Sequence, residues 1–134
     1  MDQQLSPTDR ERYRRQLMLP GFTADHQRWL GRSTALVAGI GGLGGTAALY
    51  LAAAGIGRLI LVHAGNLTLS NLNRQVLMKY EKIGTSRVGQ ARQTIKEMNP
   101  DVEIEIVDER ITEANVESML RTARIALSAR PNFS

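Results

Sequence analysis

Short apolar runs alternate with helix-like stretches along most of the chain. The runs at 34–38 and 58–63 are almost continuously apolar, as parallel strands covered on both faces are. Between them, small and apolar residues at 43–54 predict a helix that can lie close to a sheet. A further helix is predicted from about Ser86 to Met98, before Asn99-Pro100. This order predicts βαβ units.

The last third of the chain continues the alternation. Residues 102–107 alternate apolar with acidic side chains, which suits an edge strand. We expect Thr112 to cap a helix that reaches about Arg121, and residues 125–129 to form a fourth strand. Right-handed crossovers then give the sheet order 3-2-1-4. The prediction is an α/β fold with a Rossmann-like, doubly wound parallel sheet.

The start of the chain predicts helices that such a sheet does not require. Ser6 is placed to cap a helix, with Pro7 at the first helical position and Asp9 in the capping-box position. This helix should run to about Leu19, and a second should span 24–30. We expect residues 1–32 to form an N-terminal helical appendage. Residues 33–134 should form a nucleotide-binding half-domain, since a doubly wound sheet normally continues past its fourth strand.

Composition narrows the class of protein. The chain has 134 residues, the length of a single domain, and no cysteine, so it has neither disulfides nor a thiolate metal site. No apolar run reaches the roughly 20 residues that cross a membrane, and no secretory signal opens the sequence, so we expect a cytoplasmic protein without membrane contact. The net charge of +4 comes mostly from arginine. Without interleaved aromatic residues, the arginine clusters predict a solvated or partner-facing surface rather than nucleic-acid binding.

A glycine motif is the first candidate for chemistry. Gly39-Ile40-Gly41-Gly42-Leu43-Gly44 directly follows the first strand and opens the next helix. Gly39 permits a tight turn, Gly41 lets the backbone approach phosphate, and Gly44 lets helix and strand pack closely. The helix amides then face an anion. The alternative is a turn that serves packing alone.

The residues after the second strand argue against NAD. His63-Ala64-Gly65-Asn66 offers no carboxylate for ribose hydroxyls, although His63 could itself contact a ribose or have no role. The long loop that follows contains Ser70, which we expect to cap a helical turn and aim Asn71 and Arg74 in one direction. Arginine suits a polyphosphate because it is bidentate and always charged. The alternative is a structural Asn–Arg pair.

Together these motifs resemble the ThiF/MoeB/HesA family, bacterial relatives of the ubiquitin-activating enzymes, and most of all its HesA branch. The resemblance covers the chain from Arg12 onward, and the chain looks like an N-terminal half. The segments that carry it are Arg12-Tyr13-Arg14-Arg15-Gln16, the glycine motif, Gly55-Ile56-Gly57, residues 63–65, Ser70-Asn71-Leu72-Asn73-Arg74-Gln75, Ile83-Gly84, Asn99-Pro100 and residues 129–133.

The resemblance implies an ATP-dependent adenylyltransferase. Such an enzyme uses ATP and Mg²⁺ to adenylate the C-terminal carboxylate of a small ubiquitin-like sulfur-carrier protein, in cofactor biosynthesis linked to sulfur, molybdenum or nitrogen fixation. It works as a homodimer, in which Arg15 would reach the phosphates of the partner subunit. The residues implied in catalysis are Arg15, Arg74 and Arg87; those implied in nucleotide binding are Gly39, Gly41, Gly42, Leu43, Gly44, His63, Asn71, Arg74 and Asn132.

The sequence departs from the family pattern at charged positions. The ribose-binding acid falls on His63 and a second acid on Gly65, while the phosphate-contacting lysine falls on Arg87. The aspartate that binds Mg²⁺ falls on Pro131, so we assign no metal ligand. An alternative function is therefore a diverged, non-catalytic relative that binds only nucleotide or carrier protein.

Overall fold

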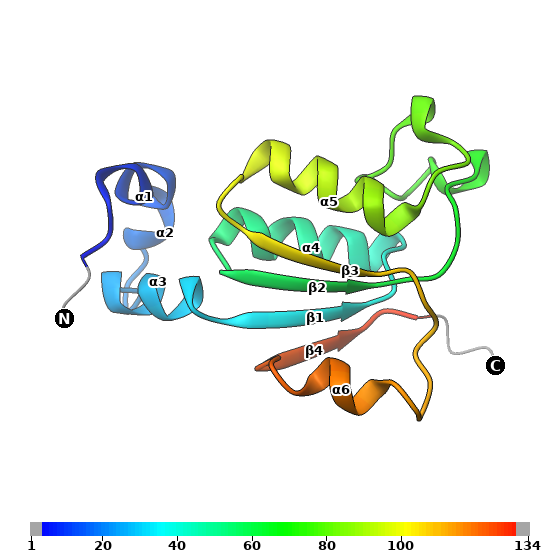
Figure 1. The fold of residues 1–134 in the computed structure, drawn as a ribbon. Coiled ribbons are helices and arrows are strands. Elements are labelled where there is room, and N and C mark those ends of the chain that lie inside the picture. Colours follow the sequence, from blue (N-terminus) through cyan, green and yellow to red (C-terminus); the bar gives the residue numbers. More distant parts are fainter. Residues whose placement is uncertain (1–3, 131–134) are drawn as a thin grey trace.

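Four parallel strands form one sheet in the computed structural model, which describes residues 4–130. The strands are β1 (Thr34–Ala38), β2 (Arg58–Val62), β3 (Glu103–Val107) and β4 (Ile125–Ser128), in the order β3-β2-β1-β4 (Figure 1). The predicted order is confirmed, and the alternating strand β3 lies at an edge. The predicted α/β fold with a Rossmann-like parallel sheet is therefore correct.

The helices that follow the strands cover the sheet unequally. Helices α4 (Gly42–Ala54) and α5 (Arg87–Met98) pack on one face, and the short α6 (Val116–Leu120) on the other (Figure 1). The larger apolar core lies under α4 and α5, while a smaller cluster lies under α6. None of the helices within residues 4–130 is long and apolar enough to cross a membrane.

The predicted helix at 112–121 is shorter in the structure. Helix α6 begins after Asn115, whose Oδ1 accepts a hydrogen bond from the backbone N–H of Thr112 at 2.8 Å. Residues 112–115 are held in a turn by this contact, because an Asn side chain can replace a helical bond with a local one. The expectation that Thr112 caps the helix was wrong.

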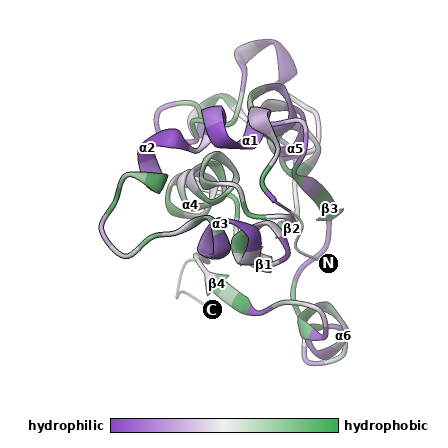
Figure 2. Ribbon diagram, turned by 90° about the vertical axis from the view of Figure 1, so that its left-hand side faces the viewer, coloured by the Kyte–Doolittle hydropathy of each residue, from purple (hydrophilic) through white to green (hydrophobic). Residues whose placement is uncertain are grey.

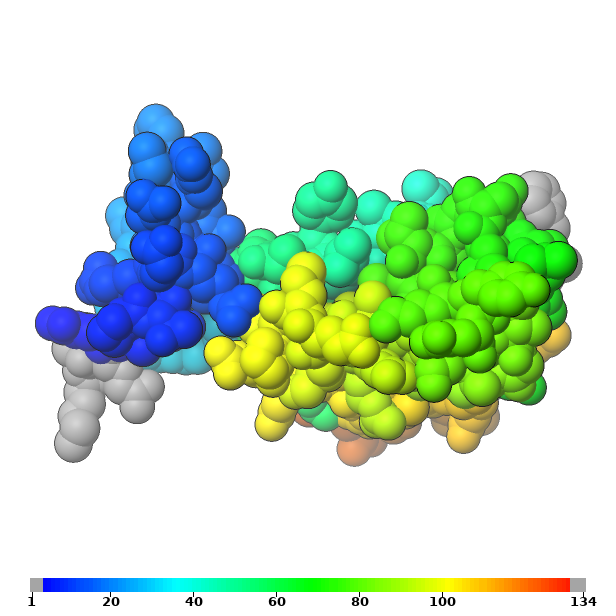
Figure 3. Space-filling model, turned by 90° about the horizontal axis from the view of Figure 1, so that it is seen from above, coloured from blue at the N-terminus to red at the C-terminus, as the bar shows by residue number. Residues whose placement is uncertain are grey.

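Three N-terminal helices lie at the amino ends of the strands: α1 (Pro7–Arg12), α2 (Arg14–Leu17) and α3 (Ala24–Gly31) (Figure 1). From above, these residues project at one end of the molecule, and the loop after β2 lies at the other (Figure 3). The Ser6 cap is confirmed, because its side chain accepts the N–H of Asp9 at 3.0 Å. The single helix expected to reach Leu19 is wrong.

Burial of Tyr13 interrupts that helix. The backbone of Tyr13 has φ −101° and ψ 13°, and its side chain is only 7% exposed. The ring packs on Gly55, where an added Cβ would lie 2.6 Å from the tyrosine Cζ. The break therefore lets the ring turn inward while the helices on either side keep their polar faces in water.

Helices α1 and α2 are mostly hydrophilic and contain no buried residue (Figure 2). The N-terminal segment is therefore joined to the rest of the fold largely by hydrogen bonds. Asn99 donates from Nδ2 to the Tyr13 hydroxyl at 3.2 Å and to the Ala52 carbonyl at 3.0 Å. Gln16 and Gln27 donate to the Ala54 carbonyl at 2.6 and 2.9 Å. The end of α4 thus accepts bonds from two different parts of the chain.

Asn99→Ala should lower the free energy of unfolding by about 2 kcal/mol, because it removes the hydrogen bonds that a buried side chain donates to the Tyr13 hydroxyl and the Ala52 carbonyl. Urea unfolding followed by circular dichroism measures the change. Gln93→Ala, on the exposed side of α5, is the control and should change stability by less than about 0.5 kcal/mol. Equal effects of both changes would show that the Asn99 contacts do not stabilise the fold.

Candidate functional site

The glycine turn between β1 and α4 has no room for side chains at two positions. Gly39 has φ +94°, and a Cβ there would lie 2.9 Å from the carbonyl oxygen of Ala129. A Cβ at Gly44 would lie 1.6 Å from the carbonyl oxygen of Gly39. At Gly41, by contrast, a Cβ would meet only the Gln75 amide nitrogen, at 3.8 Å. The tight turn and the close packing are therefore observed, and the space over Gly41 is open.

The amino end of α4 presents amides without partners in the helix. The first helical bond runs from the N–H of Gly45 to the carbonyl of Gly41 at 2.9 Å, and no side chain caps the helix. The amides of Gly42, Leu43 and Gly44 precede this bond, and Leu43 is 82% exposed. Such amides, together with the dipole of a 13-residue helix, favour an anion at this end.

Arg74 lies over this helix end. A Cβ at Gly42 would lie 3.4 Å from the Arg74 Cγ. The Nη1 of Arg74 donates to the Ser70 carbonyl at 3.0 Å and to the Asn73 Oδ1 at 2.8 Å. No further hydrogen bond from this guanidinium joins it to the described residues, so its Nε and Nη2 remain as donors for a ligand.

Arg87 begins α5 and reaches the end of β2. Its Nη2 donates to the Ala64 carbonyl at 3.1 Å, and its Nε is buried without an acceptor among residues 4–130. Burial lowers the pKa of Arg87; the charge of Asp108 raises it, and the charge of Arg74 lowers it further. Two guanidinium groups therefore repel each other here, and within residues 4–130 neither forms an ion pair. A bound polyanion would offset the repulsion between the two guanidinium groups and would give each of them an ion pair.

His63 joins the end of β2 to the glycine turn. Its Nδ1 accepts the backbone N–H of Ile40 at 3.0 Å, so the neutral ring carries its proton on Nε2. Burial lowers the pKa of His63 most, the charge of Arg87 lowers it further, and Asp108 opposes both. His63 thus has a structural role, which the sequence analysis had left open.

The loop after β2 is ordered by a residue other than the one expected. Thr68, rather than Ser70, caps the short 3₁₀ helix η1 (Leu69–Asn71), because the Asn71 Oδ1 accepts the Thr68 N–H at 2.9 Å and its hydroxyl at 3.1 Å. Arg74 bonds to Asn73, so the structure shows no Asn71–Arg74 side-chain pair. A second 3₁₀ turn, η2 (Tyr80–Lys82), follows before α5.

Asp108 is a residue that the sequence analysis missed. It directly follows β3, and its Oδ1 accepts the backbone N–H of Gly65 at 3.2 Å. The segment 63–66 itself carries no carboxylate, as its sequence shows, but the neighbouring strand brings one beside it. The available signal was its position: carboxyl ends of adjacent parallel strands meet at one edge of the sheet.

Not every predicted site residue lies at this edge. Arg15 lies on α2, beside the amino ends of the strands, whereas the glycine turn follows the carboxyl end of β1 (Figure 1). Asn132, like Pro131, lies outside the described residues. The structure brings together the glycine turn, His63, Arg74 and Arg87, whereas the Asn71 side chain is buried and bonds to Thr68 in its own loop.

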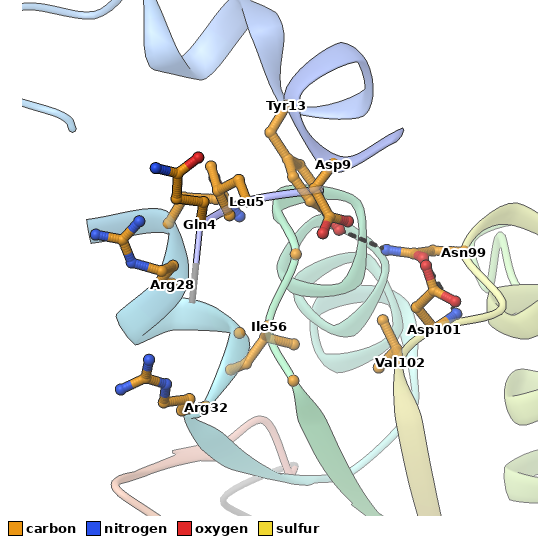
Figure 4. A pocket seen from close by; sticks show the side chains of 14 residues that line it. Gln4, Leu5, Asp9, Tyr13, Arg28, Arg32, Ile56, Asn99, Asp101 and Val102 are labelled. Carbon is orange, nitrogen blue, oxygen red and sulfur yellow. Dashed lines mark hydrogen bonds between the residues drawn. The ribbon is translucent and has the colours of Figure 1, made fainter. Parts of the chain in front are cut away.

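A cavity of about 330 Å³ lies at the opposite end of the sheet (Figure 4). Its lining includes Tyr13, Asn99 and Ile56, with Arg28 and Asp101 on opposing sides. Since it adjoins the amino ends of the strands, it is separate from the glycine turn.

The pKa of His63 predicts a pH-dependent stability. The pKa of His63 in the folded state lies below its ordinary value of 6.5, so on lowering the pH the unfolded chain takes up this proton first. The contribution of His63 to stability is therefore complete above pH 6.5 and is lost as the pH falls. His63→Gln should reduce the difference in unfolding free energy between pH values of about 7.5 and 5.5, measured by urea unfolding. His26→Gln, on α3, should keep that difference. Wild-type pH dependence in His63→Gln would contradict the assignment.

Comparisons with known proteins agree with this architecture. The ThiF family model matches residues 13–134. Protein HesA of Leptolyngbya boryana is 56% identical over 97% of this chain and 47% of its own length. The sulfur carrier protein ThiS adenylyltransferase of Escherichia coli strain K12 is 35% identical over 97% of this chain and 52% of its own.

A solved structure of the E. coli tRNA N6-threonylcarbamoyladenosine dehydratase TcdA, in complex with ATP, superposes with a TM-score of 0.85 at 27% identity. The alignment covers 93% of this chain and 51% of that chain. The chain spans about half the length of the curated relatives it matches. These matches confirm the resemblance that its motifs indicated, and the chain belongs to the ThiF family.

Proposed function

We propose that the glycine turn binds ATP, and that the chain takes part in adenylating the C-terminal carboxylate of a small ubiquitin-like sulfur-carrier protein. The observation that carries the proposal is the pair Arg74 and Arg87, which lack ion pairs among the described residues, beside the uncapped amino end of α4. A relative named for ThiS adenylylation and a structural neighbour that holds ATP support the same chemistry.

The residues present fit a nucleoside triphosphate. The Nε of Arg87 is buried without an acceptor among the described residues, and the Nε and Nη2 of Arg74 form no hydrogen bond with them. Gly41 leaves open space where a phosphate can approach the backbone. The amides of α4 and the two guanidinium groups would together bind the phosphate oxygens.

In the reaction we propose, a carboxylate oxygen of the carrier attacks the α-phosphorus. A bond forms between that oxygen and phosphorus, the bond to the oxygen that bridges to the β-phosphorus breaks, and pyrophosphate leaves with the electron pair. Arg74 and Arg87 contribute by holding the phosphates in place and by stabilising the negative charge that develops on them. Neither residue needs to transfer a proton.

Magnesium is expected from the family resemblance, and we assign no metal ligand to a residue of this sequence. Residues 4–130 contain no group of three or more His, Asp or Glu side chains that could hold a metal ion. Mg²⁺ is often held by one or two carboxylates together with substrate phosphates. We assign no step of the reaction to a metal.

We also propose a homodimer, in which Arg15 serves the site of the second copy. Arg15 and the glycine turn lie at opposite ends of the sheet, so Arg15 cannot reach the phosphates in its own subunit (Figure 1). On this proposal residues 1–32 are the part of the chain that carries the arginine, and residues 33–134 are the part that binds the nucleotide.

A non-catalytic binding protein is the second candidate. It is supported by the loss of two carboxylates, since His63 and Pro131 occupy positions where the family pattern has acidic residues. ATP–pyrophosphate exchange in the presence of a Gly-Gly-ending carrier separates the two: exchange supports the adenylyltransferase, whereas ATP binding without exchange supports the binding protein.

Arg74→Ala and Arg87→Ala should each weaken ATP binding by about 10- to 150-fold, the range expected for loss of a charged hydrogen bond. Isothermal titration calorimetry measures the affinity. Arg92→Ala, an exposed arginine on α5, should bind ATP like the wild type. If the wild-type protein shows no heat of binding at millimolar ATP, the proposed function is wrong.

Arg15→Ala should lower the exchange rate, and mixing it with Arg74→Ala should restore activity. A mixed dimer has one site with Arg74 from one copy and Arg15 from the other. Random mixing makes half of the dimers mixed and leaves half of their sites intact, so about a quarter of wild-type exchange should return. If the mixture exchanges no faster than the sum of the two variants measured alone, Arg15 does not serve the site of the second copy.

A further inference from the structure

We propose that Asp108 is the carboxylate that binds the ribose hydroxyls of the nucleotide. This inference rests on the proposed ATP site and adds a residue to it from a strand that the motifs do not include. The position, the remaining hydrogen-bonding capacity and the surroundings of Asp108 each support the assignment.

The sheet order places Asp108 on the nucleoside side of the site. The amides that would bind phosphate follow β1, and β2 separates β1 from β3. Asp108 directly follows β3, so it lies one strand further from the phosphates than the end of β2 does. In open parallel sheets the ligand lies along this edge, outside the carboxyl ends of the strands.

One oxygen of Asp108 remains for a ligand. Oδ1 accepts the N–H of Gly65 at 3.2 Å, which fixes the orientation of the carboxylate. Oδ2 has no hydrogen-bond partner among the residues the structure describes, and the side chain is exposed. A charged acceptor that is already oriented by a backbone bond suits a hydroxyl donor.

The end of β2 cannot supply this acceptor itself. Nucleotide-binding βαβ units use an acid there for the ribose, but His63 occupies the strand end and its Nδ1 is taken by the Ile40 N–H. Gly65 has φ +114°, and a Cβ there would lie 3.0 Å from the Arg87 Nη2. A side chain at 65 would therefore be strained in its backbone and would crowd the guanidinium, whereas Asp108 approaches the same turn from β3.

Because Asp108 is negatively charged, removing its charge should change ribose binding and phosphate binding in opposite directions. A carboxylate attracts ribose hydroxyls but repels phosphates. Asp108→Asn can still accept the Gly65 N–H through Oδ1, while the oxygen offered to the ribose becomes an amide nitrogen. The variant should therefore bind the nucleoside part more weakly and the phosphate part at least as tightly.

Calorimetry with ATP, 2′,3′-dideoxy-ATP and tripolyphosphate measures these parts separately. Wild-type protein should prefer ATP over dideoxy-ATP by about tenfold or more. Asp108→Asn should reduce that preference to less than about twofold, with unchanged or tighter tripolyphosphate binding. Asp101→Asn, at the opposite end of β3, is the matched control and should keep the wild-type preference.

The outcomes distinguish the two proposals. If ATP and tripolyphosphate bind but the preference for ATP is the same in Asp108→Asn and wild type, the role of Asp108 is overturned and the ATP site stands. If Asp108→Asn loses tripolyphosphate binding together with the preference, its role is structural and the inference is again wrong. Absence of binding by the wild type would overturn both proposals.

Discussion

The close approach of the first turn of α4 to the end of β1 determines the rest of the site. A Cβ at Gly44 would lie 1.6 Å from the Gly39 oxygen, and one at Gly39 would lie 2.9 Å from the Ala129 oxygen. With side chains at these positions, the helix would have to move away from both β1 and the segment after β4. Its unpartnered amides would then no longer lie beside Arg74 and His63. The position of the open space over Gly41 therefore depends on Gly39 and Gly44, where backbone atoms leave no room for a side chain.

The positive charge at this edge works against the stability of the isolated chain. Arg87 is partly buried, its Nε has no acceptor among the described residues, and Arg74 repels it. A structural arginine would normally be paired with a carboxylate at such a place. Polar groups left without partners concentrate at functional sites because a ligand completes them. The electrostatics thus agree with the geometry of the glycine turn, although the two arise from different parts of the chain.

The sequence predicts what depends on local pattern. The alternation at 102–107 placed β3 at the edge, and the glycine spacing placed the turn and α4, because these features need only neighbouring residues. The break at Tyr13 was missed, since it depends on Gly55 and Asn99, which are distant in sequence. Asp108 was missed for the same reason: it meets Gly65 only through strand pairing. Local pattern thus predicts the turn and the strand order, but not the contacts between strand ends.

The replacement of an acid by His63 also affects Arg87. A carboxylate at position 63 would lie at the end of β2, where the Arg87 Nη2 already bonds to the neighbouring Ala64 carbonyl. It would compete with phosphates for the guanidinium. The neutral ring of His63 leaves that guanidinium available and bonds to the Ile40 amide instead. Asp108 supplies negative charge from β3, where it orients Gly65 and forms no ion pair with Arg87 among the described residues. On the proposals above, the histidine therefore separates phosphate binding from ribose binding along the sheet edge, with Arg74 at the start of α4, Arg87 at the end of β2 and the carboxylate after β3.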